Sequence, residues 1–218
     1  MVQAGSSRDE IKASLNEKAD AYWANYDTYD TVFEDAEKNY VAKQTWDENG
    51  IAVTMIKYSA TDVTPEMMEK WRADPIAIQM ACNPNLSREE LPDQEGNKCW
   101  HMMMQMPMMI SNRSIVTVFY QWELEDGTKC VMHSSLGNDA IAESIADRIG
   151  SNVIANNICT KTTFKPSGSG VDITMLVSMD PAGMIPGFIK NKISTRLANA
   201  GLIMANYLRD GTIPEPMF

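Results

Sequence analysis

Hydrophobic residues at the beginning of the chain follow a helical period. Ser7 and Glu10 have the spacing of a capping box, which marks a helix start. Apolar side chains then recur every three or four residues, at Ile11, Leu15, Ala19, Tyr22 and Tyr26. This pattern predicts an amphipathic first helix.

The pattern then changes to short strand-like runs. Strands are predicted near 31–34, 40–47 and 51–60, and Asn49-Gly50 between the last two is typical of a tight hairpin. Thr64 before Pro65 predicts the start of a short helix. From 79 to 179 the chain reads as a meander of strands with turn sequences at "DQEG", "EDG" and "PSGSG". One segment, "NDAIAESIADRIG", has helical spacing and a glycine stop, so it predicts an inserted helix.

The last element, "MIPGFIKNKISTRLANAGLIMANYLRD", predicts one long amphipathic helix. Its apolar stripe is Ile185, Ile189, Ile193, Leu197, Ala200, Met204 and Leu208. Helices at both ends of a long antiparallel sheet make an α+β domain. No internal repeat or low-complexity linker divides the chain, so one domain over 1–218 is expected.

Strand 113–124 carries apolar residues on both faces through its middle. The even positions include Val116, Val118 and Tyr120, whereas Ile115, Thr117 and Phe119 occupy the odd ones. A half-exposed strand would have one polar face. We therefore expect a sheet that packs one face on a helix and curls the other around something else.

Composition narrows the range of functions. The 218 residues are 44% hydrophobic and 22% charged, as in ordinary globular proteins, and the net charge of −10 argues against nucleic-acid binding. "MVQAGSSRDE" does not have the pattern of a signal peptide, and no apolar run reaches membrane-spanning length. The four cysteines are widely spaced without CxxC, which predicts buried free thiols and a cytoplasmic location.

The segment "HMMMQMPMMI" places six methionines in ten positions. Methionine fills irregular space, so the segment fits either plain core filling or the wall of an adaptable apolar site. Thioethers also bind Cu(I), but a strand that presents them to both faces argues against a metal site. His101 and His133 lack zinc-ligand spacing and are interpreted as structural, and no catalytic residue or cofactor is predicted.

Two segments resemble the steroidogenic-acute-regulatory-related lipid transfer (START) domains. "PMMISNRSIVTVFYQWELEDGTKCVMHSS" resembles their central signature, and "DPAGMIPGFIKNKIS" resembles their C-terminal signature. The order of elements fits over about 7–209. The chain departs from the family at polar positions: Ser114 stands where the family has Asp, and Ile154 where it has Arg. The family's signature after the early strands has no clear match, and the connection at "NDAIAESIADRIG" is longer than usual.

The resemblance implies a helix-grip fold, in which a curved antiparallel sheet wraps a long C-terminal helix, with a further helix at the N-terminus. It implies a single START-like domain that is not an enzyme, that binds one sterol or phospholipid in an internal tunnel, and that needs no cofactor. The gate would be the C-terminal helix and the loop before Arg113. We expect a monomer that contacts membrane surfaces transiently and binds no nucleic acid. The lipid-binding residues would be Met104, Met106, Met108, Met109, Ile110, Arg113, Ile115, Thr117, Phe119, Ile185, Phe188, Ile189, Ile193 and Leu197.

Several alternatives stay open at this point. Arg113 could pair with a carboxylate at the strand end, or it could bond a lipid head group or a gate carbonyl. Gly201 could mark a close approach of a strand or room for a ligand. A helix-grip enzyme of the polyketide cyclase or dehydratase type would draw its acid and base from His101, His133, Tyr120 and Asp172. A ligand-sensing regulatory module would use the acidic surface and the inserted helix.

Overall fold

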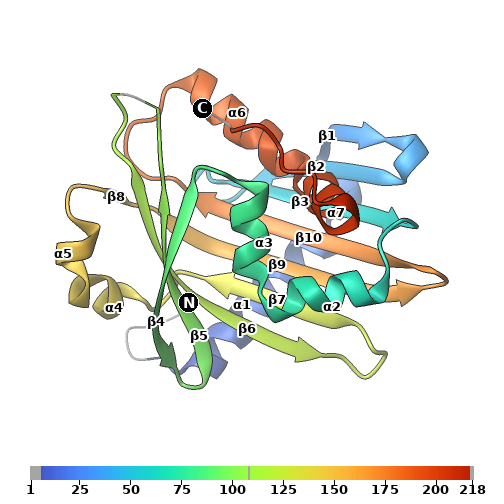
Figure 1. The fold of residues 1–218 in the computed structure, drawn as a ribbon, viewed down its shortest axis with the longest axis horizontal. Coiled ribbons are helices and arrows are strands. Elements are labelled where there is room, and N and C mark those ends of the chain that lie inside the picture. The colour runs from blue at the N-terminus through green and yellow to red at the C-terminus, as the bar shows by residue number, and fades with distance from the viewer. Residues whose placement is uncertain (1–5, 108, 217–218) are drawn as a thin grey trace.

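The computed structural model describes residues 6–107 and 109–216 and contains one curved sheet (Figure 1). Its strand order is β1-β2-β3-β10-β9-β7-β6-β5-β4, all antiparallel, with the short β8 pairing parallel to β6. The strands are β1 Asp30–Asp35, β2 Tyr40–Trp46, β3 Ala52–Ala60, β4 Leu86–Gln94, β5 Asn97–Met104, β6 Arg113–Glu123, β7 Lys129–Ser134, β8 Val153–Ile154, β9 Asn156–Ser167 and β10 Gly170–Asp180.

Helices cover both faces of this sheet. In Figure 1, α1 lies behind the sheet, and α2, α3, α6 and α7 lie in front of it. The helices are α1 Arg8–Ala24, α2 Pro65–Ala73, α3 Pro75–Cys82, α4 Asp139–Ser144, α5 Ala146–Ile149, α6 Gly187–Ala198 and α7 Ala200–Asp210, with 3-10 turns at Tyr26–Thr28 and Ala36–Lys38. Two separate apolar cores result, one on each face.

The predicted start of the first helix is confirmed. Glu10 N donates to the Ser7 side chain, and Ser7 N donates to Glu10 Oε2 over 2.8 Å, so both halves of the capping box form. Ile11, Leu15 and Ala19 are fully buried against the sheet. The capping box therefore located the start of the helix and the apolar period located the face that it buries, although Tyr26, the last residue of the predicted stripe, lies in the 3-10 turn after α1.

Both faces of β6 are buried, as the sequence predicts. Ile115 and Phe119 face the core shared with α2, α3 and α7, and Val116 and Val118 face the core under α1. Because helices cover the sheet on both sides, neither face in the middle of this strand is polar.

All four cysteines are free thiols, and Cys82 alone is half-buried rather than buried.

The expectation that the strand meander begins at 79 is wrong. Gln79 lies in α3, a helix that starts at Pro75. Asp74 caps it, since its side chain accepts from Ala77 N over 2.9 Å. An aspartate followed by proline is a helix start signal, and here it outweighs the strand-like apolar run that follows.

The predicted single C-terminal helix is also wrong, because it breaks at Asn199 into α6 and α7. The buried Tyr40 of β2 donates its hydroxyl to Ala198 O over 2.7 Å, at the end of α6. Gly201 packs on the same ring, where an added Cβ would lie 2.9 Å from Tyr40 Cε2. A strand side chain therefore occupies the space at Gly201.

The helix predicted in "NDAIAESIADRIG" is likewise divided, into α4 and α5.

Candidate functional site: an internal cavity

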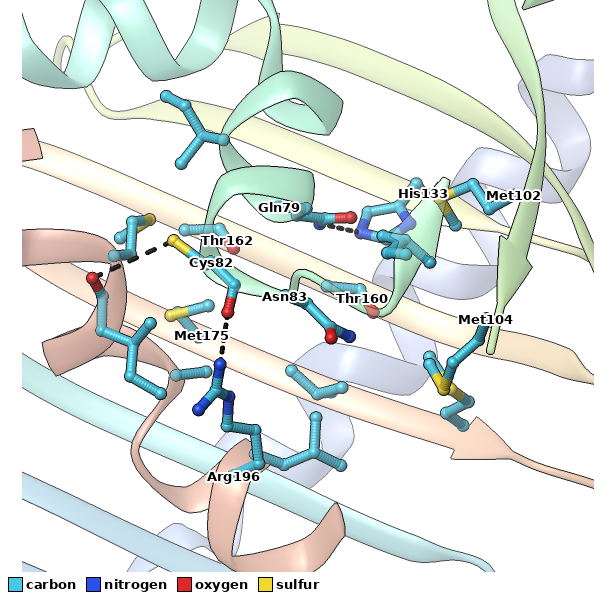
Figure 2. Close-up of a pocket in the computed structure, with 18 of the residues that line it drawn as sticks. Gln79, Cys82, Asn83, Met102, Met104, His133, Thr160, Thr162, Met175 and Arg196 are labelled. Carbon is cyan, nitrogen blue, oxygen red and sulfur yellow. Dashed lines mark hydrogen bonds between the residues drawn. The ribbon is translucent and has the colours of Figure 1, made fainter. Parts of the chain in front are cut away.

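A cavity of about 180 Å³ lies between the sheet and the helices α3, α6 and α7 (Figure 2). Its walls are mostly apolar. The apolar lining consists of Trp71, Ile78, Leu86, Met102, Met104, Ile115, Met175, Val177, Met179, Ile193, Leu197, Ala200, Ile203 and Met204, and the remaining lining residues are Gln79, Cys82, Asn83, His133, Thr160, Thr162 and Arg196.

Methionine is the most frequent residue in these walls. Met102 and Met104 are two positions apart on β5, so both point to the cavity face, and Met175 and Met179 reach it from β10. Unbranched thioether side chains change rotamer readily and fill irregular gaps. The wall can therefore change shape without moving the strands.

A second cavity of about 30 Å³ lies next to the first, at the start of β6. The two cavities have five lining side chains in common: Met104, Ile115, Met179, Ile193 and Leu197. These side chains therefore stand between the two spaces. The smaller space is completed by Met106, Arg113, Ala155 and Pro181.

Arg113 ties two loops together above the smaller cavity. Its side chain is buried, at 2% exposure, and donates from Nε to Pro181 O over 2.8 Å and from Nη2 to Ala182 O over 2.9 Å. Nη1 donates to Ser111 O. Among the described residues no carboxylate lies within ion-pair distance of this guanidinium, and burial lowers the pKa of Arg113. Of the alternatives for Arg113, contact with backbone carbonyls is the one observed, and these carbonyls belong to Ser111, Pro181 and Ala182.

His133 is the ionisable side chain of the cavity's sheet wall. Its ring stacks on Phe119 at a centroid distance of 4.4 Å, and burial lowers its pKa to about 3, so the imidazole is neutral at neutral pH. Asn157 Nδ2 lies 2.6 Å from Nδ1, and the amide orientation of Asn157 is set because the same Nδ2 donates to the backbone carbonyl of His133 over 3.2 Å, an oxygen that can only accept. Nδ1 is therefore the acceptor and Nε2 carries the hydrogen.

This tautomer also sets the role of Gln79. The side-chain amide of Gln79 lies 3.1 Å from His133 Nε2. Figure 2 draws this contact as a dashed line. Since Nε2–H is a donor, the partner atom must be the amide oxygen, which a half-turn of the Gln79 amide supplies. Gln79 lines the cavity, and its amide NH2 then has no partner among the described residues.

The acid–base residues that an enzyme would need do not meet in this cavity. Of the four sequence candidates, His133 alone lines it. His101 and Tyr120 lie on the α1 side of the sheet, where His101 contacts Ser114 Oγ at 3.1 Å. Asp172 accepts from Ser59 at the surface. Across the described part of the chain, no group of three or more His, Cys, Asp or Glu side chains is placed to hold a metal ion.

Six of the predicted lipid-binding residues line the cavities. Met104, Ile115, Ile193 and Leu197 line both, and Met106 and Arg113 line the smaller one. Four others are buried without contacting either cavity: Thr117, Phe119, Ile185 and Ile189.

The remaining predicted residues lie on the outside or beyond the description. Met109 is 99% exposed at the tip of the loop before β6, and Phe188 is 66% exposed at the start of α6. Ile110 is half-buried in the same loop, and Met108 lies outside the described residues. Any contact of Met109 or Phe188 with a lipid would therefore be made at the outer surface.

Sequence reasoning missed the wall that α2 and α3 provide. Trp71, Ile78 and Cys82 line the larger cavity from these helices, and so does the amide of Asn83 just after α3. The Asp74-Pro75 start signal would have revealed α3, but the direction in which its side chains point depends on tertiary packing. Arg196 and Met204 were likewise not singled out as site residues.

Comparison with known proteins gives matches in fold but not in sequence. No family model matches the chain, and no curated protein gives a significant sequence match. Human StAR-related lipid transfer protein 5 superposes with a TM-score of 0.71 at 13% identity, over 93% of this chain and 95% of that one. Human STARD10 gives a TM-score of 0.65 at 17% identity, over 83% and 72% of the two chains. A fragment of the STAR-related lipid transfer protein from Xanthomonas axonopodis gives 0.62 at 17% identity, over 84% and 99%.

These matches agree with the two signature segments and with the arrangement in Figure 1, in which an antiparallel sheet encloses the C-terminal helices. None of the helices within 6–107 and 109–216 has the length and hydrophobicity that a bilayer crossing requires. At identities of 13 to 17% the likeness concerns the fold. The chain therefore has the START-like helix-grip fold.

Proposed function

We propose that this protein binds a lipid in the internal cavity and carries it between membranes without catalysing a reaction. The observation that carries the proposal is the apolar cavity of about 180 Å³ between the concave sheet and α3, α6 and α7. Apolar surface removed from water at ~25 cal/mol per Å² supplies the binding free energy. Two of the matched structures are themselves named as lipid transfer proteins, which supports the same function.

The cavity must enlarge when it loads. A volume of about 180 Å³ is close to the ~150 Å³ of a cavity that holds benzene. A sterol or a phospholipid needs more room. We propose that Met104 and Met179, which stand between the two cavities, rotate away and join them into one tunnel.

The gate in this proposal is the end of the molecule where Arg113 joins two loops. Residues 109–112, just before β6, and the connection 181–186 lie side by side there, at the upper left of Figure 1. Opening requires the loss of the Arg113 bonds to Pro181 and Ala182, after which the smaller cavity is uncovered. A single side chain with carbonyl partners is a simple latch.

The same end carries exposed apolar side chains that suit transient contact with a membrane surface. Met109 is 99%, Met184 96% and Phe188 66% exposed. Each apolar side chain of this size gains ~1.5–3 kcal/mol when it leaves water. Three of them give a reversible attachment that brings the gate to the lipid. The free cysteines support a cytoplasmic carrier, which we propose acts as a monomer.

Native mass spectrometry of the freshly purified protein tests the binding step. We expect one bound lipid mass per chain, lost on organic extraction and regained from vesicles. A transfer assay between donor and acceptor vesicles then tests the carrier step. The variant Met109→Ser/Met184→Ser/Phe188→Ser should slow transfer about tenfold or more while it still binds lipid in detergent. Purified protein that is free of lipid and takes none up would contradict the proposal.

A further inference from the structure

Among the described residues that line the larger cavity, Arg196 is the one with a cationic side chain. It lies on α6 and is half-buried. Its Nη2 donates to Cys82 O over 2.5 Å, a bond drawn in Figure 2, and its Nη1 lies 3.4 Å from Glu215 O. These carbonyls hold the guanidinium plane in position, but neither carries a charge.

The charge of Arg196 is not compensated within the described part of the chain. Arg72, Arg88, Arg148 and Arg209 each form an ion pair with an aspartate or glutamate, and Arg196 forms none. Burial lowers its pKa. The chain has 29 acidic and 19 basic residues, and yet no acidic side chain is among the described residues that line the cavity. An unpaired charge at an apolar cavity is costly, and an anion that binds the guanidinium removes this cost.

The polar groups near Arg196 are also donors. Asn83 is the residue that ends α3, and its Oδ1 already accepts from Asn85 N over 3.3 Å. The amide NH2 of Asn83 donates to none of the residues that the structure describes, and it lines the cavity. Gln79, one helical turn earlier, lines the same cavity, and its NH2 is available to donate when its oxygen accepts from His133. The end of the cavity at Arg196 therefore offers hydrogen-bond donors and a positive charge.

We propose that the cavity selects lipids with one acyl chain and an anionic head group, a carboxylate or a phosphate, and that Arg196 is the counter-ion. This inference rests on the proposed function and specifies its ligand. The guanidinium binds two oxygens of one head group, and Asn83 donates to a further lone pair. The chain passes Ile193 and Leu197, which line both cavities, and ends in the smaller space below Arg113. The head group enters first and the tail follows on the gate side.

The small size of the cavities favours one acyl chain over two, and even one chain requires them to enlarge. The larger space is about 180 Å³ and the smaller about 30 Å³, and five side chains separate them. Rotation of methionines opens a narrow passage along α6, which accommodates one chain. Two chains side by side would require the sheet and the helix to separate, because packed side chains fill the remaining interior.

A pair of fluorescent probes with the same chain tests the role of charge. We would measure binding of cis-parinaric acid and of its uncharged methyl ester to the delipidated full chain. Wild type should bind the acid about tenfold or more tightly than the ester, and added salt should reduce this preference. Arg196→Gln should bring the acid to the level of the ester and leave ester binding unchanged. Arg196→Lys should keep part of the preference, because it keeps the charge but loses the bidentate geometry.

Arg209→Gln is the matched control, since it removes an arginine from the neighbouring α7 that is exposed and paired with Asp62. It should leave both affinities unchanged. Circular dichroism would confirm that each variant is folded. If Arg196→Gln does not fold, the Lys variant and the salt dependence of wild type decide the question. Equal binding of acid and ester by wild type would overturn the inference and leave the lipid site standing. Binding of neither would overturn the proposed function as well.

Competition against the bound acid distinguishes the sources of the anion. Oleate and lysophosphatidic acid should displace the probe, whereas lysophosphatidylcholine, which has the same chain and a zwitterionic head, should displace it about tenfold less well. Millimolar inorganic phosphate should have no effect, because the chain supplies most of the binding free energy. Displacement by inorganic phosphate alone would identify Arg196 as a site for free anions and overturn the inference.

Discussion

Removal of the Arg113 guanidinium should loosen the proposed gate by an amount that follows from its bonds. Two of its hydrogen bonds cross between loops, to Pro181 O at 2.8 Å and to Ala182 O at 2.9 Å, and the side chain is 2% exposed. A hydrogen bond from a charged donor contributes ~1.5–3 kcal/mol. Arg113→Ala should therefore lower the free energy of gate opening by about 3 kcal/mol, which is about a hundredfold in the open population.

Hydrogen exchange and lipid release measure this effect. In Arg113→Ala, peptides that cover 105–112 and 181–190 should exchange about a hundredfold faster, and bound lipid should leave faster by a similar factor when opening limits release. The free energy of unfolding in urea should fall by about 3 kcal/mol, because the same bonds are lost on unfolding. Arg113→Lys should give a smaller effect, because an ammonium can still reach one carbonyl.

Arg209→Gln serves as the control for loss of an exposed arginine, for which a change of ~0–1 kcal/mol is expected. Unchanged exchange in both gate segments of Arg113→Ala would refute the reasoning, because it would mean that water replaces the guanidinium at no free-energy difference. Faster exchange of the gate segments without faster lipid release would mean that Arg113 holds the two segments together but that the lipid leaves by another route.

Three further predictions concern the cavity and the helix above it. Burial lowers the pKa of His133 to about 3, so below pH 6.5 the unfolded chain binds a proton that the folded chain does not. The free energy of unfolding therefore falls as the pH is lowered, down to about pH 3. Between pH 7 and 5 this loss, measured by urea denaturation at each pH, should be about 2 kcal/mol greater in wild type than in His133→Gln. Tyr40→Phe removes the hydroxyl that donates to Ala198 O and should lower the unfolding free energy by ~1 kcal/mol in the same assay, whereas no change would mean that the bond does not position α6. Met104→Trp should fill the space between the two cavities and reduce the bound lipid seen by native mass spectrometry about tenfold or more without loss of folding; full occupancy would mean that the chain does not pass this side chain.

Local signals predicted the elements that depend on neighbours in sequence. The capping box at Ser7 predicts α1, and Thr64 before Pro65 predicts α2, because capping side chains bond backbone amides three residues away. The three early strands fall within one or two residues of their predicted limits. Asn49-Gly50 sits in the turn that it predicts, with Gly50 at φ +71°. The two signature segments predicted the START-like fold because they mark the entry into β6 and the start of α6.

Contacts between distant residues decided the features that the sequence did not predict. The C-terminal apolar stripe continues without interruption through Asn199, whereas the helix breaks there, beside the bond from Tyr40 to Ala198 O that joins residues more than 150 positions apart. Gln79 could be placed in the cavity only once α3 was known to lie across the sheet opposite His133.

The methionine-rich segment shows the same division. Its composition indicates an adaptable apolar wall, and Met102 and Met104 do line the cavity. Its period does not say that Met109 turns outward at a loop tip with φ +78°. The sequence also does not predict that Arg196 lies unpaired at the cavity. That property depends on the tertiary structure, in which no described carboxylate lies within ion-pair distance of it. Periodicity and capping act over one or two helical turns, whereas this cavity is the space that side chains from ten helices and strands leave unfilled.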